Sequence, residues 1–224
     1  MFARIVAAAA LAGLLAGLLL SALQQVAIAP LILAAEVRED AARAAGNLPH
    51  ADPDTDHAHA WTPAGPRQRL AATAAANIAV ATGFALLLAA LMSLRDASGW
   101  RAGLAYGAAG YAVVFVAPAL GLPPELPGSA SAPLQVREVW WIATVIASAA
   151  GLGLIAFTRK PALRAAGIML LLAPHAVGAP QPAAHDALHP AAAVTDFIRA
   201  TYLVNGALWL ALGGLVGYCR RARR

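Results

Sequence analysis

A short polar segment of the chain carries three histidines and three aspartates. It reads His50-Ala-Asp52-Pro-Asp54-Thr-Asp56-His57-Ala-His59. Imidazole is a common ligand of cobalt, nickel, copper and zinc, whereas carboxylate suits harder cations. The alternating aspartates resemble the start of an EF-hand, but that loop needs Gly where His57 stands and Glu where Pro63 stands, so we exclude it. We therefore predict capture of a divalent cation, with the candidate ligands His50, Asp54, Asp56, His57 and His59. The alternative is a polar loop that binds metal weakly and without function.

Four further candidate ligands stand outside this segment: His175, Glu125, Gln24 and Gln25. Polar side chains within apolar stretches are costly in lipid, so they usually face a bundle interior or a cavity. Gln24, Gln25, Asn77, His175 and Asn205 lie within such stretches and predict a polar vestibule, with Glu125 at the mouth of the bundle. The alternative is that each makes one hydrogen bond between helices. His185 and His189 stand four residues apart, but the neighbouring prolines disfavour a long helix there, so they are weaker candidates.

The composition points to a membrane protein. Hydrophobic residues make up 60% of the 224 residues and charged residues 12%, and the mean hydropathy is +0.66. A soluble domain carries about a quarter charged residues. The net charge of +5 comes largely from arginines in short loops, which is a topology signal and excludes a nucleic-acid-binding surface. The single Cys219 cannot form an intrachain disulfide.

Six apolar stretches must position the candidate ligands. A helix needs about 20 apolar residues to cross a bilayer. We predict an all-α, polytopic helical bundle of about six transmembrane helices in a single domain, residues 1–224. The first stretch is longer than the apolar core of a signal peptide, so we expect it to be retained. A re-entrant segment is the alternative for the short fifth stretch. The stretches are residues 5–33, 70–94, 102–122, 139–157, 165–179 and 200–219.

Charge sets the orientation that we expect. Six crossings with both termini cytoplasmic place Arg4, Lys160 and the arginine-rich tail inside. All six histidines, ten of the eleven carboxylates and the polar loop 36–69 then face outward. Five crossings would put the tail on the outer side, against the positive-inside rule.

An Ala-Pro pair ends each stretch that runs outward: Ala29-Pro30, Ala117-Pro118 and Ala173-Pro174. The repetition suggests three helical hairpins that open outward. Proline leaves the carbonyl four residues earlier without its usual partner, so each pair either kinks or ends a helix, or helps to form a vestibule.

Small residues four apart recur at Gly13/Gly17, Gly103/Gly107 and Gly213/Gly217. Such pairs let helix backbones approach closely. They predict either packing within the bundle or a subunit interface.

Several enzymatic motifs are missing from the sequence. It has no phosphate-binding Walker loop, no nucleophile elbow and no His-Glu-x-x-His motif. We therefore expect neither ATP hydrolysis by this chain nor enzymatic activity, and no tightly bound cofactor.

Motifs along the chain resemble one family. They are Gln24-Gln25 with Ala29-Pro-Leu-Ile-Leu-Ala-Ala-Glu36, His57-Ala-His59-Ala-Trp61-x-Pro63-x-Gly65, Ala117-Pro-Ala-Leu-Gly-Leu-Pro-Pro-Glu-Leu-Pro127, Trp140-Trp141, and Pro174-His175-x-x-Gly178-Ala-Pro-Gln-Pro182. The chain is similar to the CbtA family of predicted cobalt transporter subunits. The resemblance implies cobalt uptake for cobalamin biosynthesis in a bacterial inner membrane. It also implies a small one-span partner, CbtB, with its own histidine motif.

These observations together predict a membrane subunit of a cobalt uptake transporter. Co²⁺ is the expected cargo, and Ni²⁺ and Zn²⁺ are alternatives. Two other classes remain open: a membrane scaffold that docks a partner without transport, and a membrane enzyme with a histidine metal centre.

Overall fold

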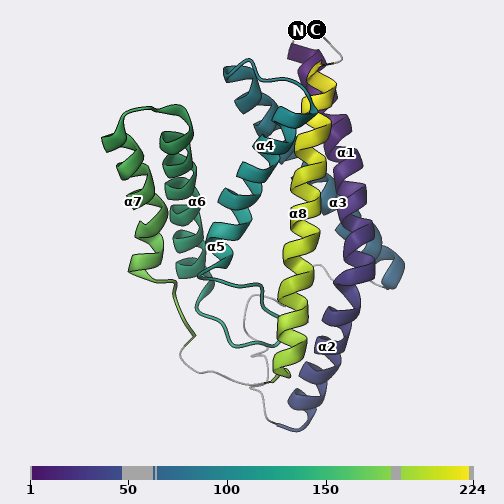
Figure 1. Ribbon diagram of the computed structural model, residues 1–224. Helices are drawn as coiled ribbons and strands as arrows, with labels where there is room; N and C mark the ends of the chain where they lie inside the picture. Colours follow the sequence, from purple (N-terminus) through teal and green to yellow (C-terminus); the bar gives the residue numbers. More distant parts are fainter. Residues whose placement is uncertain (1, 47–62, 64, 183–187, 222–224) are drawn as a thin grey trace.

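The regular structure is helical throughout the residues that the structure describes. The computed structural model describes residues 2–46, 63, 65–182 and 188–221. The elements in chain order are α1 (Phe2–Ala27), α2 (Ala29–Ala44), α3 (Pro66–Leu94), α4 (Trp100–Gly110), the π-helix η2 (Tyr111–Val116), α5 (Ala117–Ala119), α6 (Leu134–Phe157), α7 (Pro161–Val177) and α8 (Ala191–Arg221). The predicted all-α membrane bundle is confirmed (Figure 1).

Five of these helical segments are long and apolar enough to cross a membrane. They are α1, α3, the continuous run from α4 to α5, α6 and α8. A further apolar helix, α7, has 17 residues and spans about 26 Å, slightly less than a hydrocarbon core of about 30 Å, so it fits either a crossing or a re-entrant segment. It lies alongside α6, and the long apolar segments, α1, α3, the run from α4 to α5, α6, α7 and α8, alternate in direction (Figure 1). Consequently α1 begins and α8 ends at the same end of the bundle.

We call that end the terminus end; it also holds the connections 95–99 and 158–160. The opposite end is the loop end, formed by α2, residues 120–133, the end of α7 and the start of α8 (Figure 1). Both described histidines belong to the loop end, because His175 lies in the last turn of α7 and His189 just precedes α8.

The first predicted stretch, 5–33, is two helices rather than one. Pro30 has no N–H, so regular bonding is interrupted near Ile28. The Ile28 N–H still bonds to the Gln24 carbonyl at 2.9 Å, and the Leu31 N–H bonds to the Ile28 carbonyl at 3.0 Å. The chain therefore bends and continues as α2 instead of stopping.

The last helix begins earlier than the predicted residue 200. The charges of Asp196 and Arg199 lower the local hydropathy, but both side chains are exposed on α8 and do not interrupt its backbone. Hydropathy therefore marked the apolar part of this helix and not its start.

The prolines of the other two Ala-Pro pairs, Pro118 and Pro174, lie close to helix ends. Pro118 follows η2, where the winding widens and the Ala117 N–H bonds to the Ala112 carbonyl, five residues back. Pro174 precedes the end of α7, which Gly178 terminates with a φ of 87°. The interpretation of the Ala-Pro pairs as kinks or ends is confirmed.

Glycines set the closest helix contacts. A Cβ at Gly103 would collide with the Gly213 carbonyl, and one at Gly107 would collide with the Trp209 carbonyl. A Cβ at Gly17 would lie 2.6 Å from the Ile78 Cα. These contacts join α4 to α8 and α1 to α3, so the glycine pairs serve packing within the bundle and not an interface between subunits.

The helix pairing differs from three outward-opening hairpins. The closest pairs are α1 with α3, α6 with α7, and α4 with α8. Of these pairs, only α1 and α3 are consecutive crossings connected by a chain segment at the loop end. The connection between α6 and α7 lies at the terminus end, and α4 and α8 are not consecutive in the chain. The reason is the glycine surface of α4, which fits α8 and not its neighbour in the chain, α6.

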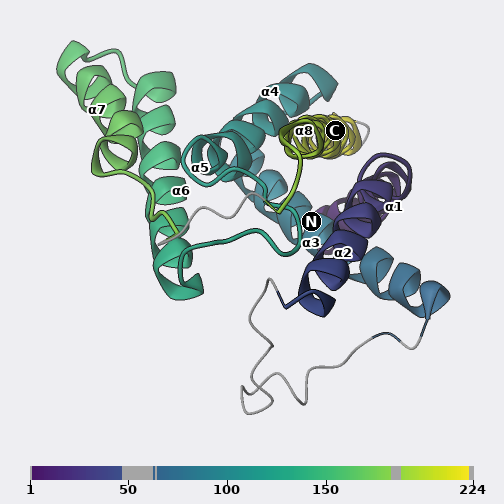
Figure 2. The ribbon, with the colours of Figure 1, turned by 90° about the horizontal axis from the view of Figure 1, so that it is seen from below.

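The core lies among α1, α3 and α8. Small residues such as Ala16 and Ala85 are fully buried there beside Leu212. Figure 2 shows that α6 and α7 stand to one side of this core, next to α5. They meet the rest through α5 and η2, and at the terminus end the Arg95 guanidinium lies 3.9 Å from the centre of the Phe157 ring.

Candidate functional site

The loop end carries the described candidate ligands, but they do not form one cluster. The five ligands predicted in the polar loop, His50, Asp54, Asp56, His57 and His59, lie outside the described residues. Within the described residues, no three side chains of the His, Cys, Asp and Glu types come close enough to hold a metal ion. The four remaining candidates occupy three separate places.

Gln24 belongs to a hydrogen-bond network between α1 and α3. The Asn77 Nδ2 donates to the Gln24 Oε1 at 2.7 Å and to the Ser21 Oγ at 3.1 Å. The Ser21 hydroxyl donates to the Gly17 carbonyl at 2.8 Å. Three polar groups are thus satisfied where two helices touch, which is the packing role weighed for Gln24 and Asn77. Gln25, one residue further along, is exposed.

The other intramembrane amide also bonds locally. The Asn205 Nδ2 donates to the Thr201 carbonyl of its own helix at 3.0 Å. Gln24, Gln25, Asn77 and Asn205 are not among the residues that line the cavity described below, although Thr201, whose carbonyl accepts from Asn205, borders it.

His175 packs against an aromatic neighbour. Its ring meets the Trp140 ring edge to face, with the centroids 6.0 Å apart and the planes at 71°. The side chain is half-buried, and neither ring nitrogen has a hydrogen-bond partner among the described residues. An imidazole with free nitrogens near the molecular surface remains able to bind a cation.

Glu125 lies beside a cavity of about 750 Å³. The cavity lies between η2 and α5 on one side and the start of α6 on the other, and Thr201 of α8 also borders it. The Glu125 Oε2 is 3.1 Å from the Arg137 Nη2. Glu125 is therefore already paired with a cationic side chain, and the cavity walls are mainly apolar.

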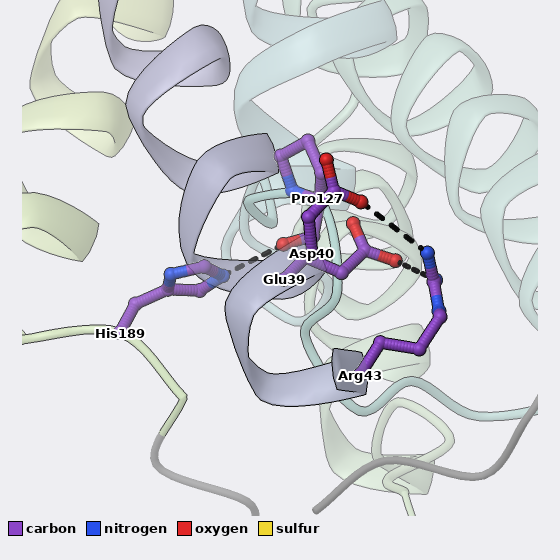
Figure 3. Close-up of polar contacts among 5 residues, drawn as sticks. All are labelled: Glu39, Asp40, Arg43, Pro127 and His189. Carbon is purple, nitrogen blue, oxygen red and sulfur yellow. Dashed lines mark hydrogen bonds and ion pairs between the residues drawn. The ribbon is translucent and has the colours of Figure 1, made fainter. Parts of the chain in front are cut away.

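His189 holds the loop end together instead of presenting free nitrogens. It is 8% exposed, and its Nε2 lies 2.7 Å from the Pro127 carbonyl oxygen (Figure 3). Its Nδ1 is buried without a partner among the described residues. The hydrogen bond ties the chain before α8 to the segment between α5 and α6. Sequence analysis could not identify this bond, because its acceptor is a backbone atom 62 residues away.

Ion pairs brace α2 at the same end. The Arg43 Nη2 lies 2.6 Å from the Glu39 Oε1 and its Nη1 lies 3.5 Å from the Asp40 Oδ1 (Figure 3). Glu36 pairs with Arg69 at the start of α3, with the Oε1 2.5 Å from the Nη2. The hydrogen bond from Arg69 lowers the pKa of Glu36 below its ordinary value. This pair links α2 to the first turn of α3.

Comparison with known proteins adds one finding. The family model described as "Probable cobalt transporter subunit (CbtA)" matches residues 2–221, nearly the whole chain. No curated protein and no solved structure matches the chain significantly.

Proposed function

The chain belongs to the CbtA family of probable cobalt transporter subunits, and from this premise we propose that it captures Co²⁺ at the loop end and passes it into the bundle. The subunit role follows from the family. The capture residues, the ion path and the compartment are our proposal.

The supporting observation is the division of charge between the two ends. The loop end carries most of the described carboxylates, Glu36, Glu39, Asp40, Glu125, Glu138 and Asp196, together with six arginines, Arg38, Arg43, Arg67, Arg69, Arg137 and Arg199. The terminus end carries Arg95, Arg101, Arg159, Lys160, Arg164, Arg220 and Arg221. The positive-inside rule then assigns the terminus end to the cytoplasm of a bacterial inner membrane. Over the whole sequence, the side that we propose as outer holds ten carboxylates and six arginines, and this acidic excess raises the local concentration of cations.

We propose two stages of capture. The loop residues His50, Asp54, Asp56, His57 and His59 collect the ion first, and His175 receives it. Weak and successive sites suit transport because the ion must also leave. Gln25 is exposed and can join them, whereas Gln24 and Glu125 must first exchange their present partners, Asn77 and Arg137.

The partner in this proposal is a one-span subunit of the CbtB type, and the imported cobalt serves cobalamin biosynthesis. The family description supports a multi-subunit transporter because it names the chain a subunit. Co-purification of this chain and the one-span subunit, each tagged and expressed in the same membrane, tests the pairing. Separate elution of the two chains would contradict it.

Cobalt accumulation in cells tests the capture residues. The triple variant His50→Ala, His57→Ala, His59→Ala and the single variant His175→Ala should each lower uptake at limiting Co²⁺. A matched control replaces Thr55 and Thr62 of the same segment with Ala. Normal uptake by both histidine variants at wild-type expression would eliminate the two-stage capture.

Metal binding by the purified protein separates the other classes. Calorimetry with Co²⁺, Ni²⁺ and Zn²⁺ should show weak binding that declines as the pH falls below about 6.5, where imidazole protonates. A stoichiometric metal retained through purification would favour the enzyme alternative. The absence of any binding, with partner docking intact, would favour the scaffold. Glycine substitutions would not distinguish a scaffold from a transporter, because the glycine pairs pack inside the bundle.

A further inference from the structure

The cavity between α5 and α6 has a lining that metal capture does not explain. Its walls include Val114, Phe115, Leu122, Leu134 and Ile142, all apolar. Its volume of about 750 Å³ far exceeds that of a water-sized ligand, which occupies about 30 Å³ in the liquid. A large apolar surface of this kind suits hydrocarbon.

Three charged side chains adjoin the same walls: Glu125, Arg137 and Glu138. Arg137 and Glu125 form an ion pair at 3.1 Å, and their side chains remain 28% and 29% exposed. Within the described residues the Arg137 guanidinium has no second carboxylate partner, and Glu138 is exposed and unpaired. The cavity thus offers donors for an anion and a carboxylate for a cation, beside an apolar surface.

We expect the cavity to lie near the boundary between headgroups and acyl chains, because it adjoins one end of a helix long and apolar enough to cross a membrane. It adjoins the first turns of α6 at the loop end, where that helix starts to cross the membrane. Trp141 lines it and is 40% exposed. Tryptophan is enriched at this depth because its ring is apolar and its N–H is polar. The surrounding lipid is therefore the nearest source of a ligand.

We propose that this cavity binds a phospholipid with a primary-amine headgroup, of the phosphatidylethanolamine type. The phosphate accepts hydrogen bonds from Arg137, the ammonium donates to Glu138, and part of an acyl chain lies against the apolar walls. An anionic headgroup without the amine leaves the carboxylates uncompensated. A trimethylammonium headgroup has no N–H to donate to Glu138.

Lipid titration of the delipidated full-length protein in detergent tests this proposal, with native mass spectrometry as the readout. Phosphatidylethanolamine, phosphatidylcholine and phosphatidylglycerol with identical acyl chains are compared, alongside soluble phosphoethanolamine. We expect the ethanolamine lipid to bind about tenfold more tightly than the other two, and soluble phosphoethanolamine not to bind. Equal binding of the three lipids would overturn the proposal, as would binding of the soluble phosphoethanolamine headgroup without acyl chains. Both results come from the wild-type protein.

Two variants then locate the site. Arg137→Gln should weaken all three phospholipids by about tenfold, because the charged donor to the phosphate is lost. Glu138→Gln should remove the preference for ethanolamine over choline. Arg199→Gln and Asp196→Asn, which change exposed charges of the same types on α8, are the matched controls. Unaltered binding by both cavity variants, or an equal loss in the controls, would refute this location. The proposal is independent of cobalt, so its failure leaves the capture role untouched.

Discussion

The contact between α4 and α8 allows a direct test with two neighbouring glycines. Gly213 faces α4, where an added Cβ would meet the Gly103 carbonyl and would lie 2.8 Å from the Gly107 Cα. Gly214 differs, because its Cβ would lie 3.5 Å from the Leu104 Cδ2, an ordinary contact distance. The same substitution, Gly→Ala, therefore introduces a clash at one position and none at the next.

The expected free-energy difference follows from these distances. Ordinary contact begins near 3.4 Å, so Gly213→Ala forces α4 and α8 apart by at least about 0.6 Å. Overpacking of this kind costs about 1–3 kcal/mol, offset by about 1 kcal/mol of helix propensity gained on replacing glycine. Gly214→Ala gains the same propensity without the clash. Gly213→Ala should thus be less stable than Gly214→Ala by about 1–3 kcal/mol.

Thermal unfolding of the two purified variants in one detergent measures this difference. Circular dichroism at the helical band gives the midpoints, which should differ by roughly 3–9 °C for a chain of this size. Because the two variants have the same composition, expression and detergent effects are matched. Equal midpoints would show that α4 and α8 do not approach as closely as the structure indicates.

Three further outcomes are expected. Asn77→Ala should lower the free energy of unfolding by about 1 kcal/mol, because the Gln24 amide oxygen loses its donor on α3. Asn205→Ala, which loses only a bond to the Thr201 carbonyl of its own helix, is the matched control in a chemical-unfolding series. Glu36→Gln should destabilise the protein slightly at pH 7, as measured by thermal unfolding, and the difference from the wild type should shrink as the pH falls into the acidic range. The pKa of Glu36 is lowered in the folded state, so its stabilisation exists above the unfolded pKa and is lost as the pH falls through the folded pKa. His189→Ala should speed amide exchange in residues 122–133, because it leaves a carbonyl without its donor, and unchanged exchange there would contradict the tie.

Much of the fold could be predicted because membrane helices follow simple rules. Long apolar runs mark crossings, and arginines mark one side. The glycine pairs also indicated close backbone contact, as observed at Gly103 and Gly213. Which helix each pair would meet could not be predicted, because spacing four apart describes one surface and not its partner. The partner of α4 proved to be α8 and not α6.

The candidate site was less accessible to sequence analysis. Polar residues inside apolar stretches predict that a partner exists, but they do not distinguish a cavity from a neighbouring helix. Gln24 illustrates this, since its partner is Asn77 on α3. The Arg137 pair with Glu125 was equally hidden, because two exposed-looking charges gave no sign of a shared cavity wall.

The pairing of α4 with α8 has a consequence for biosynthesis. Between these helices the chain contains η2, α5, α6 and α7, all of which leave the ribosome before α8. Until α8 is inserted, the glycine surface of α4 lacks the helix that it contacts in the folded protein. The α1–α3 pair can assemble early and the α6–α7 pair soon after its second helix appears. Final closure of the bundle therefore waits for the last helix to be translated.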